Sequence, residues 1–157
     1  MEYRVIGLMS GTSLDGLDVA YAHFYKTSDH WQYKLLDQET IPYPHSIINP
    51  LKGVLNSSGE SLMALDVQLG LFYGQIVEEF ITARKLHVDF VSSHGHTVFH
   101  NVDERYTTQI GNPLCIKYIT GLPVVANFRT QDVIKGCLLY TSPSPRDLST
   151  SRMPSSA

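Results

Sequence analysis

The chain has 157 residues, of which 43% are hydrophobic and 17% charged, so it is long and apolar enough to bury one sizeable core and does not belong to a disordered or fibrous class. The formal net charge is -3 and no block of like charges occurs, which excludes the basic footprint of a nucleic-acid or polybasic membrane binder. Cys115 and Cys137 give neither a disulfide framework nor a paired metal spacing, and no secretory signal is visible. We therefore expect a soluble cytoplasmic protein whose partners are small molecules, with no nucleic acid and no membrane.

Three strands are expected at the start of the chain. The segments YRVIGLM, LDVAYAHF and YKLLDQETIPY are short, apolar and rich in β-branched or aromatic residues, and the turn-like KTSDH separates the last two. Neighbouring strands with such short connections predict an antiparallel meander.

A long core helix is expected within residues 61–86. Pro44, Pro50 and Gly53 limit any helix in SIINPLKGVLNSSGE to a short piece, and Ser57 with Glu60 has the spacing of a capping box, which predicts a start near Ser61. Apolar residues then recur at three- and four-residue steps, namely at Leu62, Leu65, Leu69, Phe72, Ile76 and Phe80. Gly70 and Gly74 lie one turn apart on this helix, and their spacing predicts close packing against a neighbour rather than a ligand site.

The second half of the chain alternates strands and helices. HVDFVSSHGHTVFH is a β-type run, a polar hairpin-like segment leads to TTQIGNP, a helix is expected from Pro113 to just before Gly121, and LPVVANF closes the series as a strand. The expected order is β-β-β-α-β-α-β. This order predicts an α/β fold with a mixed β-sheet and helices packed on its faces.

The loop between the first two strands, residues 10–16, carries the clearest functional signal. Gly11 and Gly16 allow positive φ and close backbone approach, so that successive N–H groups could point at one anion, while Thr12 and Ser13 add hydroxyl donors. These features predict a phosphate site.

Two carboxylates complete this loop, which contains no Lys or Arg. Asp15 and Asp18 are oxygen ligands of the type that Mg²⁺ binds directly or through water, so a metal ion would share the neutralisation of a bound nucleotide's phosphates. The alternative is a loop rich in Gly, Ser and Asp whose side chains bond only to their own backbone.

Four segments in the right order resemble the anhydro-N-acetylmuramic acid kinases, which belong to the sugar-kinase and actin superfamily. GLMSGTSLDGLDVA is similar to that family's phosphate loop, SSHGHTVFH to its Ser-His-Gly-Gln-Thr segment, TTQIGNP to its Gln-Ile-Gly-Asn-Pro, and VVANFRTQDV to its Phe-Arg-x-x-Asp. The resemblance runs from Gly7 to about Val133. It implies the N-terminal half of an actin-like (ribonuclease H-like) ATPase domain, whose strand and helix order agrees with the one expected above.

The resemblance implies a kinase that uses ATP and Mg²⁺ to open 1,6-anhydro-N-acetylmuramic acid and to phosphorylate its O6, giving N-acetylmuramic acid 6-phosphate in peptidoglycan recycling. The residues implied to hold the ATP phosphates are Gly11, Thr12, Ser13, Leu14, Asp15, Gly16, Leu17 and Asp18, with Asp15 and Asp18 toward the metal. The residues implied to line the sugar cleft are His94, Thr97, Arg129 and Asp132. Arg129 is suited to bind the lactyl carboxylate or a phosphate, and a structural ion pair with Asp132 is the alternative.

The histidines support a rival class. His94 and His96 alternate at a strand end, so both could face one side, and His100 could supply a third nitrogen to zinc, as in a hydrolase. The phosphate-type loop then has no role and no Glu base accompanies the cluster, so this hypothesis ranks second. The family usually has Gln at the position of His96, which leaves the role of this residue open.

Residues 137–157 differ from the rest, because they are rich in Ser and Pro and lack a periodic apolar face. We expect an N-terminal actin-like kinase domain at 1–136 and a disordered or artefactual tail at 137–157. The family's following Gly-Gly-Gln-Gly-Ala-Pro-Leu-Val-Pro segment and second phosphate loop do not occur, and the resemblance places the general base and the adenine pocket in that later part. This implies an inactive fragment of a kinase, with a nucleotide-binding half-domain as the alternative and homodimerisation left open for the complete protein.

Overall fold

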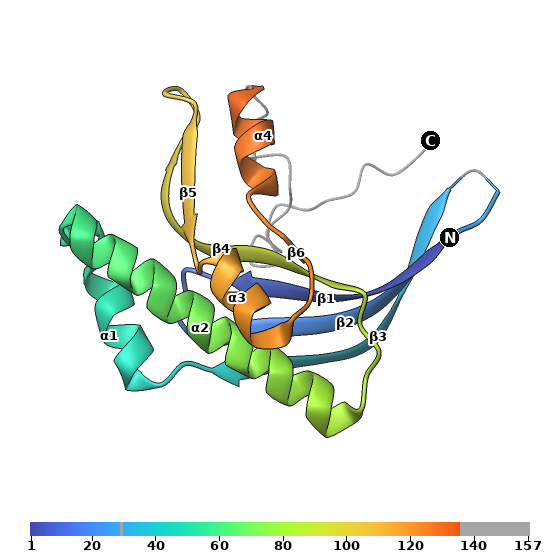
Figure 1. Ribbon diagram of the computed structural model, residues 1–157. Coiled ribbons are helices and arrows are strands. Elements are labelled where there is room, and N and C mark those ends of the chain that lie inside the picture. The colour runs from blue at the N-terminus through green and yellow to red at the C-terminus, as the bar shows by residue number, and fades with distance from the viewer. Residues whose placement is uncertain (29, 136–157) are drawn as a thin grey trace, which may run out of the picture.

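A computed structural model of the chain describes residues 1–28 and 30–135. Helices and one mixed sheet make up this part of the protein (Figure 1). The elements in chain order are β1 (Glu2–Ser10), β2 (Gly16–Lys26), β3 (Trp31–Pro42), α1 (His45–Gly53), the 3-10 turn η1 (Val54–Asn56), α2 (Gly59–Arg84), β4 (Phe90–Asn101), β5 (Tyr106–Ile110), α3 (Pro113–Thr120), β6 (Val124–Val125) and α4 (Phe128–Ile134). The expected tail at 137–157 lies outside the described residues.

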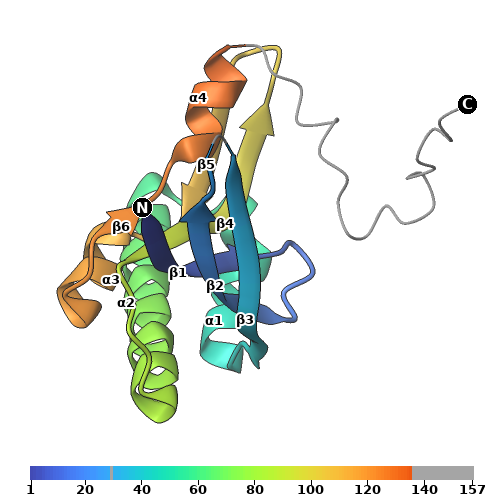
Figure 2. The same ribbon diagram turned by 90° about the vertical axis from the view of Figure 1, so that its right-hand side faces the viewer.

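The strands lie in the order β3-β2-β1-β4-β5, with β6 pairing to β4 (Figure 2). β1, β2 and β3 form the predicted antiparallel meander, whereas β4 runs parallel to both β1 and β6 and antiparallel to β5. The mixed sheet is therefore confirmed. Because β1 and β4 are parallel and Ser10 pairs with His96, β1 ends beside His96 and the loop after β1 leaves from there, while β4 runs on to Asn101.

The two faces of the sheet differ in what covers them. One face packs against α1, α2 and α3, and the buried residues of the sheet and the helices form a single cluster. The sheet residues of this covered face include Ile6, Leu8, Leu17, Val19 and Val91. The opposite face, which we call the open face, carries the alternate residues of the same strands, and large side chains such as Tyr3, Trp31 and Tyr33 are exposed.

Helix α2 begins two residues earlier than expected. Its N-cap is Ser58, whose Oγ accepts the backbone N–H of Ser61 at 3.1 Å. Ser57 instead donates its hydroxyl hydrogen to the carbonyl of Val54. The predicted capping box from Ser57 was wrong by one residue, while Glu60 does lie in the first turn, where a carboxylate complements the helix dipole.

The two glycines of α2 are where α3 packs. A Cβ on Gly70 would lie 2.5 Å from the carbonyl oxygen of Asn112, and one on Gly74 would lie 2.9 Å from Ile119. The predicted close packing is confirmed. Helix α3 also starts at Pro113 and ends before Gly121, whose φ of 69° closes it as predicted.

The end of the described chain departs from expectation. Only Val124 and Val125 of LPVVANF form a strand, because Asn127 turns the backbone with a φ of 57°. Helix α4, which was not predicted, begins at the next residue and lies beside β5 (Figure 1). This unpredicted helix carries Arg129 and so decides the geometry of one candidate site.

Candidate ligand site at the end of the sheet

The loop of residues 11–15 connects antiparallel β1 and β2 as predicted. Its backbone conformation differs from the prediction, because neither Gly11 nor Gly16 has a positive φ, whereas Leu14 has a φ of 59°. The N–H of Leu14 turns back toward the carbonyl of Gly11 at 3.4 Å, and its side chain packs against the core. Leu14 thus anchors the loop, while Thr12 beside it is exposed.

Gly16 is required for close approach rather than for a left-handed turn. A Cβ at this position would lie 2.4 Å from the carbonyl oxygen of Ile41, so only glycine lets β2 start against β3 here. Within the loop, the Ser13 hydroxyl donates to the Asp15 carboxylate at 2.5 Å. That bond orients a carboxylate that is otherwise exposed.

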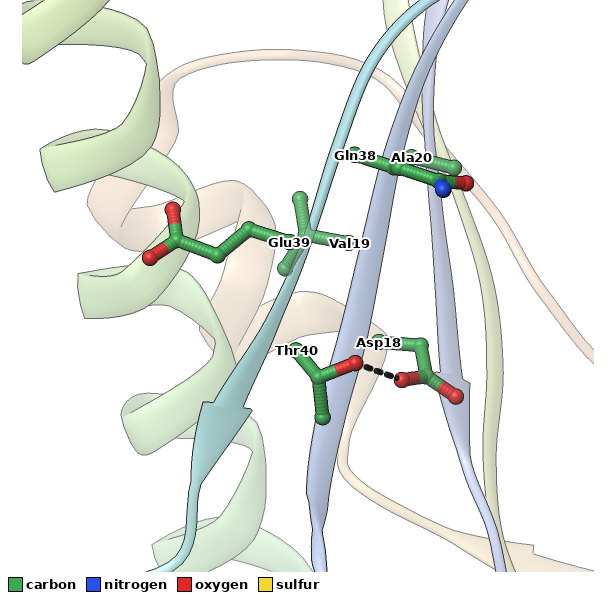
Figure 3. Close-up of a pocket in the computed structure, with 6 residues that line it drawn as sticks. All are labelled: Asp18, Val19, Ala20, Gln38, Glu39 and Thr40. Atoms are coloured by element: carbon green, nitrogen blue, oxygen red, sulfur yellow. Dashed lines mark hydrogen bonds between the residues drawn. The ribbon is translucent and has the colours of Figure 1, made fainter.

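Asp18 lies on the open face, three residues past the loop. Its carboxylate accepts a hydrogen bond of 2.6 Å from the Thr40 hydroxyl and lines a shallow pocket of about 380 Å³. Figure 3 shows the lining residues: Val19 and Glu39 point toward α2, and the other four point to the open face. Glu39 is paired with Arg84 of α2 at 2.6 Å, which leaves Asp18 as the carboxylate of this pocket that faces away from the helices.

A cationic cluster from β4 and α4 forms the second part of the site. Nη1 of Arg129 lies 2.9 Å from Nε2 of His94 and donates to Oγ1 of Thr97 at 3.1 Å. Three of the four residues expected at the sugar cleft are therefore together. Asp132, the fourth, is exposed on α4, and Arg129 makes no ion pair with any described residue, so the alternative of an Arg129–Asp132 pair was wrong.

The electrostatics of this cluster favour an anion. Burial lowers the pKa of His94, and the charge of Arg129 lowers it further, while Nδ1 lies 2.9 Å from the carbonyl oxygen of Gly95. A neutral His94 that donates from Nδ1 and accepts at Nε2 leaves the guanidinium charge of Arg129 uncompensated. Burial also lowers the pKa of Arg129, which remains protonated at neutral pH.

The Asp18 pocket and the cationic cluster lie on one face. Alternation along β4 places His94 on the open face with Phe90 and Ser92, and in the pairing register Met9 lies between Asp18 on one side and β4 on the other. Asp18 and His94 are thus two strands apart, which corresponds to about 10 Å between backbones. Oxygen ligands and an uncompensated cation at this spacing suit a phosphorylated ligand bound with a divalent metal.

The covered face at the same end holds a different cluster. Ser10 accepts from the Tyr43 hydroxyl at 2.7 Å, Tyr43 lies 3.1 Å from the Tyr73 hydroxyl, and Ser10 Oγ lies 3.0 Å from Nδ1 of His96. Burial raises the pKa of both tyrosines and lowers that of His96. This cluster is therefore neutral and closes the base of the loop, because Ser10 precedes the loop and Tyr43 follows the partner of Gly16, Pro42.

His94 and His96 do not act as one pair of ligands. Gly95 between them has a φ of 74°, and the β1–β4 register shifts here, so the expectation that both rings could face one side was wrong. Among residues 1–28 and 30–135, no group of three or more His, Cys, Asp or Glu side chains could hold a metal ion. The zinc set with His100 is thus not assembled in the described part of the chain.

Sequence reasoning missed Ser10, Tyr43 and Tyr73. Ser10 gave a usable signal, since it is the one polar residue that ends a buried apolar strand immediately before the loop. Tyr73 gave none, because a tyrosine within an apolar helical stripe is indistinguishable from core packing.

An antiparallel meander whose first strand runs parallel to a later, helix-linked strand is the start of an actin-like (ribonuclease H-like) ATPase fold, and here it carries a hydroxyl- and Asp-rich loop after β1. This is the class of protein that the fold and the site define. The sequence pattern of the anhydro-N-acetylmuramic acid kinase family matches residues 3–138, and the chain belongs to this family.

Curated relatives carry the same family name. The anhydro-N-acetylmuramic acid kinase of Francisella tularensis subsp. novicida is 33% identical over 147 residues, which covers 86% of this chain and 39% of the relative. Those of Bacillus cereus (strain ATCC 10987 / NRS 248) and Acaryochloris marina are 35% and 36% identical, covering 84% and 85% of this chain and 37% of each relative. The chain spans about two fifths of the length of these relatives. No helix among the described residues is long and apolar enough to cross a membrane.

Proposed function

We propose that the complete protein is a cytoplasmic, ATP- and Mg²⁺-dependent kinase that opens 1,6-anhydro-N-acetylmuramic acid and phosphorylates it to N-acetylmuramic acid 6-phosphate. One observation carries the proposal: two exposed carboxylates beside a loop without basic side chains lie on the same part of the sheet as a half-buried guanidinium that makes no ion pair with any described residue. The membership in the kinase family agrees with it.

The phosphate side of the site is the loop with Asp15 and Asp18. Both carboxylates are exposed and oxygen-only, and a threonine hydroxyl lies against one of them, so the donor set fits Mg²⁺. When bound, the metal would offset the charge of the transferring phosphoryl group. The chain's own contribution is to hold the ATP phosphates along residues 11–18 and to orient Asp15 through Ser13.

The sugar side is the cluster of His94, Thr97 and Arg129. The guanidinium is suited to bind the lactyl carboxylate bidentately, and Thr97 and neutral His94 both contact its Nη1. Asp132 lies one turn away on α4 and faces solvent, so it would contact the sugar only at the rim. Cleavage of the 1,6-anhydro bridge develops negative charge on O6, and an in-line phosphoryl group held between the two sides takes up that charge as it forms.

The decisive test uses Asp15→Ala and Asp18→Ala in the complete protein, assayed with ATP, Mg²⁺ and the anhydro-sugar. Loss of a group that positions the transferring phosphoryl is expected to lower kcat by a factor of about 10² to 10³ and to change the Mg²⁺ dependence, while thermal unfolding stays near that of the parent. Asp103→Ala, an equally exposed carboxylate in the β4–β5 turn, serves as the matched control and should keep full activity. Parent-like turnover in both variants would rule out this loop as the metal-dependent phosphate site.

The 157-residue chain alone should bind nucleotide weakly and show no turnover, because the family resemblance places the general base and the adenine pocket beyond it. Calorimetry with Mg·ATP and an ADP-release assay measure the two properties. Turnover by this chain would instead place the base within residues 1–157, with Asp132 as the first residue to test. Binding without turnover in the complete protein would favour the alternative of a nucleotide-binding half-domain.

A further inference from the structure

Three hydroxyl groups on the covered face form a row that ends at a histidine ring. The hydroxyl groups of Tyr73, Tyr43 and Ser10, which we call the hydroxyl relay, are joined by contacts of 3.1 and 2.7 Å, and Ser10 Oγ lies 3.0 Å from Nδ1 of His96. They come from α2, from the segment after β3 and from β1, and they meet β4. All four side chains are buried, with Tyr73 0%, Ser10 2% and His96 4% exposed.

The hydrogen bonds of the relay have a direction. Tyr43 donates its single hydroxyl hydrogen to Ser10, so the contact between the two tyrosines requires Tyr73 to donate to Tyr43. Ser10, which accepts from Tyr43, then donates its hydrogen to Nδ1 of His96, 3.0 Å away. In the opposite direction Tyr43 would donate to Tyr73 and could not donate to Ser10 in their 2.7 Å hydrogen bond.

This direction determines the two nitrogens of His96. A neutral imidazole that accepts at Nδ1 carries its hydrogen on Nε2. Within the described chain, Nε2 of His96 has no hydrogen-bond partner. The one side-chain nitrogen or oxygen there that is fully buried and lacks a hydrogen bond is Ser93 Oγ. Nε2 of His96 is therefore not fully buried. His96 pairs with Ser10, so it lies where β1 ends and the loop of residues 11–15 departs. Burial lowers the pKa of His96, which agrees with a neutral ring at pH 7.

We propose that the hydroxyl relay fixes His96 as the tautomer with hydrogen on Nε2 and so makes it an uncharged hydrogen-bond donor to a ligand oxygen, from a phosphate or a sugar, at this edge of the sheet. His96 is then a binding residue, and Ser10, Tyr43 and Tyr73 are positioning residues that act through it. The identity of the ligand rests on the function proposed above, whereas the tautomer does not. An uncharged donor is suited to a site that already contains the guanidinium of Arg129, because a second cation there would cost desolvation and repulsion.

The first experiment reads the tautomer in the free 157-residue chain. Long-range ¹H–¹⁵N NMR of histidine-labelled protein at pH 7.5 should show His96 with an unprotonated Nδ1 and a protonated Nε2. Ser10→Ala removes the donor and should give a tautomer mixture, while Ser10→Thr, which keeps the hydroxyl, should restore the parent spectrum. Ser93→Ala is the matched control, since it removes a buried serine hydroxyl of β4 that has no hydrogen-bond partner in the described part of the chain. A hydrogen on Nδ1, or a spectrum unchanged by Ser10→Ala, would overturn the proposal.

The second experiment reads the donor role by titrating the same sample with Mg·ATP, inorganic phosphate and 1,6-anhydro-N-acetylmuramic acid. At least one of these ligands should shift the Nε2–H signal of His96. A shift with phosphate or Mg·ATP would identify the acceptor as a phosphate oxygen. A shift with the anhydro-sugar alone would identify it as a sugar oxygen. His96→Gln keeps an N–H donor and should retain that ligand's affinity within about threefold, whereas His96→Phe should weaken it about tenfold, as expected for one hydrogen bond. A Nε2–H signal that none of the three moves overturns the donor role. If Asp15→Ala does not change the affinity for Mg·ATP, the proposed function is contradicted, whereas the conclusion on the His96 tautomer is unaffected.

Discussion

The two faces of the sheet carry polar clusters at the same edge, and they are built by opposite rules. On the open face, Asp18 and Arg129 have no oppositely charged partner among residues 1–28 and 30–135, since Asp18 bonds to a hydroxyl and Arg129 to a neutral histidine and a hydroxyl. On the covered face, Ser10, Tyr43 and Tyr73 are neutral, buried and joined to one another. A buried polar group is costly unless it is satisfied within the protein, so the covered cluster must be complete before any ligand binds, whereas the open cluster can leave its charges for one. The difference predicts that mutations of the three hydroxyl residues Ser10, Tyr43 and Tyr73 act mainly on stability, and those of Asp18 and Arg129 mainly on binding.

The largest loss of stability is expected for Gly111→Ala, because Gly111 lies against the ring of Tyr73 in the covered cluster. Gly111 has a φ of 114°, which disfavours any side chain, and a Cβ there would lie 2.6 Å from the ring of Tyr73. The combined strain and displacement should lower the free energy of unfolding by about 3 kcal/mol or more, as urea denaturation would measure. Gly53→Ala is the control, because a Cβ at that position meets nothing within 4 Å, and it should stay close to the parent. Equal stabilities of the two variants would show that Tyr73 is free to move.

The next effect compares one hydrogen bond on each face. Tyr43→Phe leaves two buried hydroxyl groups with fewer partners and should cost about 1–3 kcal/mol of unfolding free energy. Thr40→Val removes the hydroxyl that bonds to Asp18 on the open face and should change that free energy by less than about 0.5 kcal/mol, because exposed groups regain water. A larger loss for Thr40→Val than for Tyr43→Phe would reverse the comparison of the two faces.

The same contrast explains what could be predicted from the sequence. The open-face residues were named as candidates from the sequence, because Asp18 lies by a loop whose residue types indicate chemistry, and His94 and Arg129 lie in segments that resemble the kinase family. The antiparallel meander, the long helix and the packing at Gly70 and Gly74 followed from periodicity and spacing, which depend on local pattern. Motifs and hydrophobic periodicity are both read from residues close together in the sequence, so features that depend on such residues can be predicted.

What escaped prediction depends on contacts between distant segments. The relay joins residues 10, 43, 73 and 96, and no spacing along the chain marks a hydrogen bond between them. Leu14 takes the left-handed conformation that was expected of the glycines, because its side chain reaches the core while Gly16 is needed against Ile41. Helix α4 was missed because VVANF reads as one apolar strand until Asn127 turns the backbone.

A smaller effect should appear in the pH dependence of stability. The pKa values of both His94 and His96 are lowered below 6.5 in the folded chain, first by burial. The unfolded chain therefore takes up these protons at higher pH than the folded chain, so the stabilising contribution is complete above pH 6.5 and is lost as pH falls from 6.5 through the folded pKa values. Denaturation midpoints at pH 7.5, 6.5 and 5.5 should decline for the parent and less for the double variant His94→Gln/His96→Gln. Identical slopes for the two proteins would show that these rings do not titrate as the burial implies.

The smallest expected effect separates charge from burial within the open cluster, through Arg129→Gln. The charge of Arg129 lowers the pKa of His94 and its side chain helps to shield the ring, so replacing it with a neutral, shorter group weakens both causes in the same direction. The pKa of His94, read by NMR titration, should therefore rise toward 6.5, while that of His96 on the other face should follow only slightly, through the changed charge of His94. Arg84→Gln is the matched control, because it removes an arginine that is paired with Asp37 and Glu39 at the β3 edge, and it should leave both pKa values unchanged. A His94 pKa that falls or stays constant in Arg129→Gln would mean that the guanidinium does not contribute to the lowered pKa of this ring, and burial would then be the cause that keeps His94 neutral.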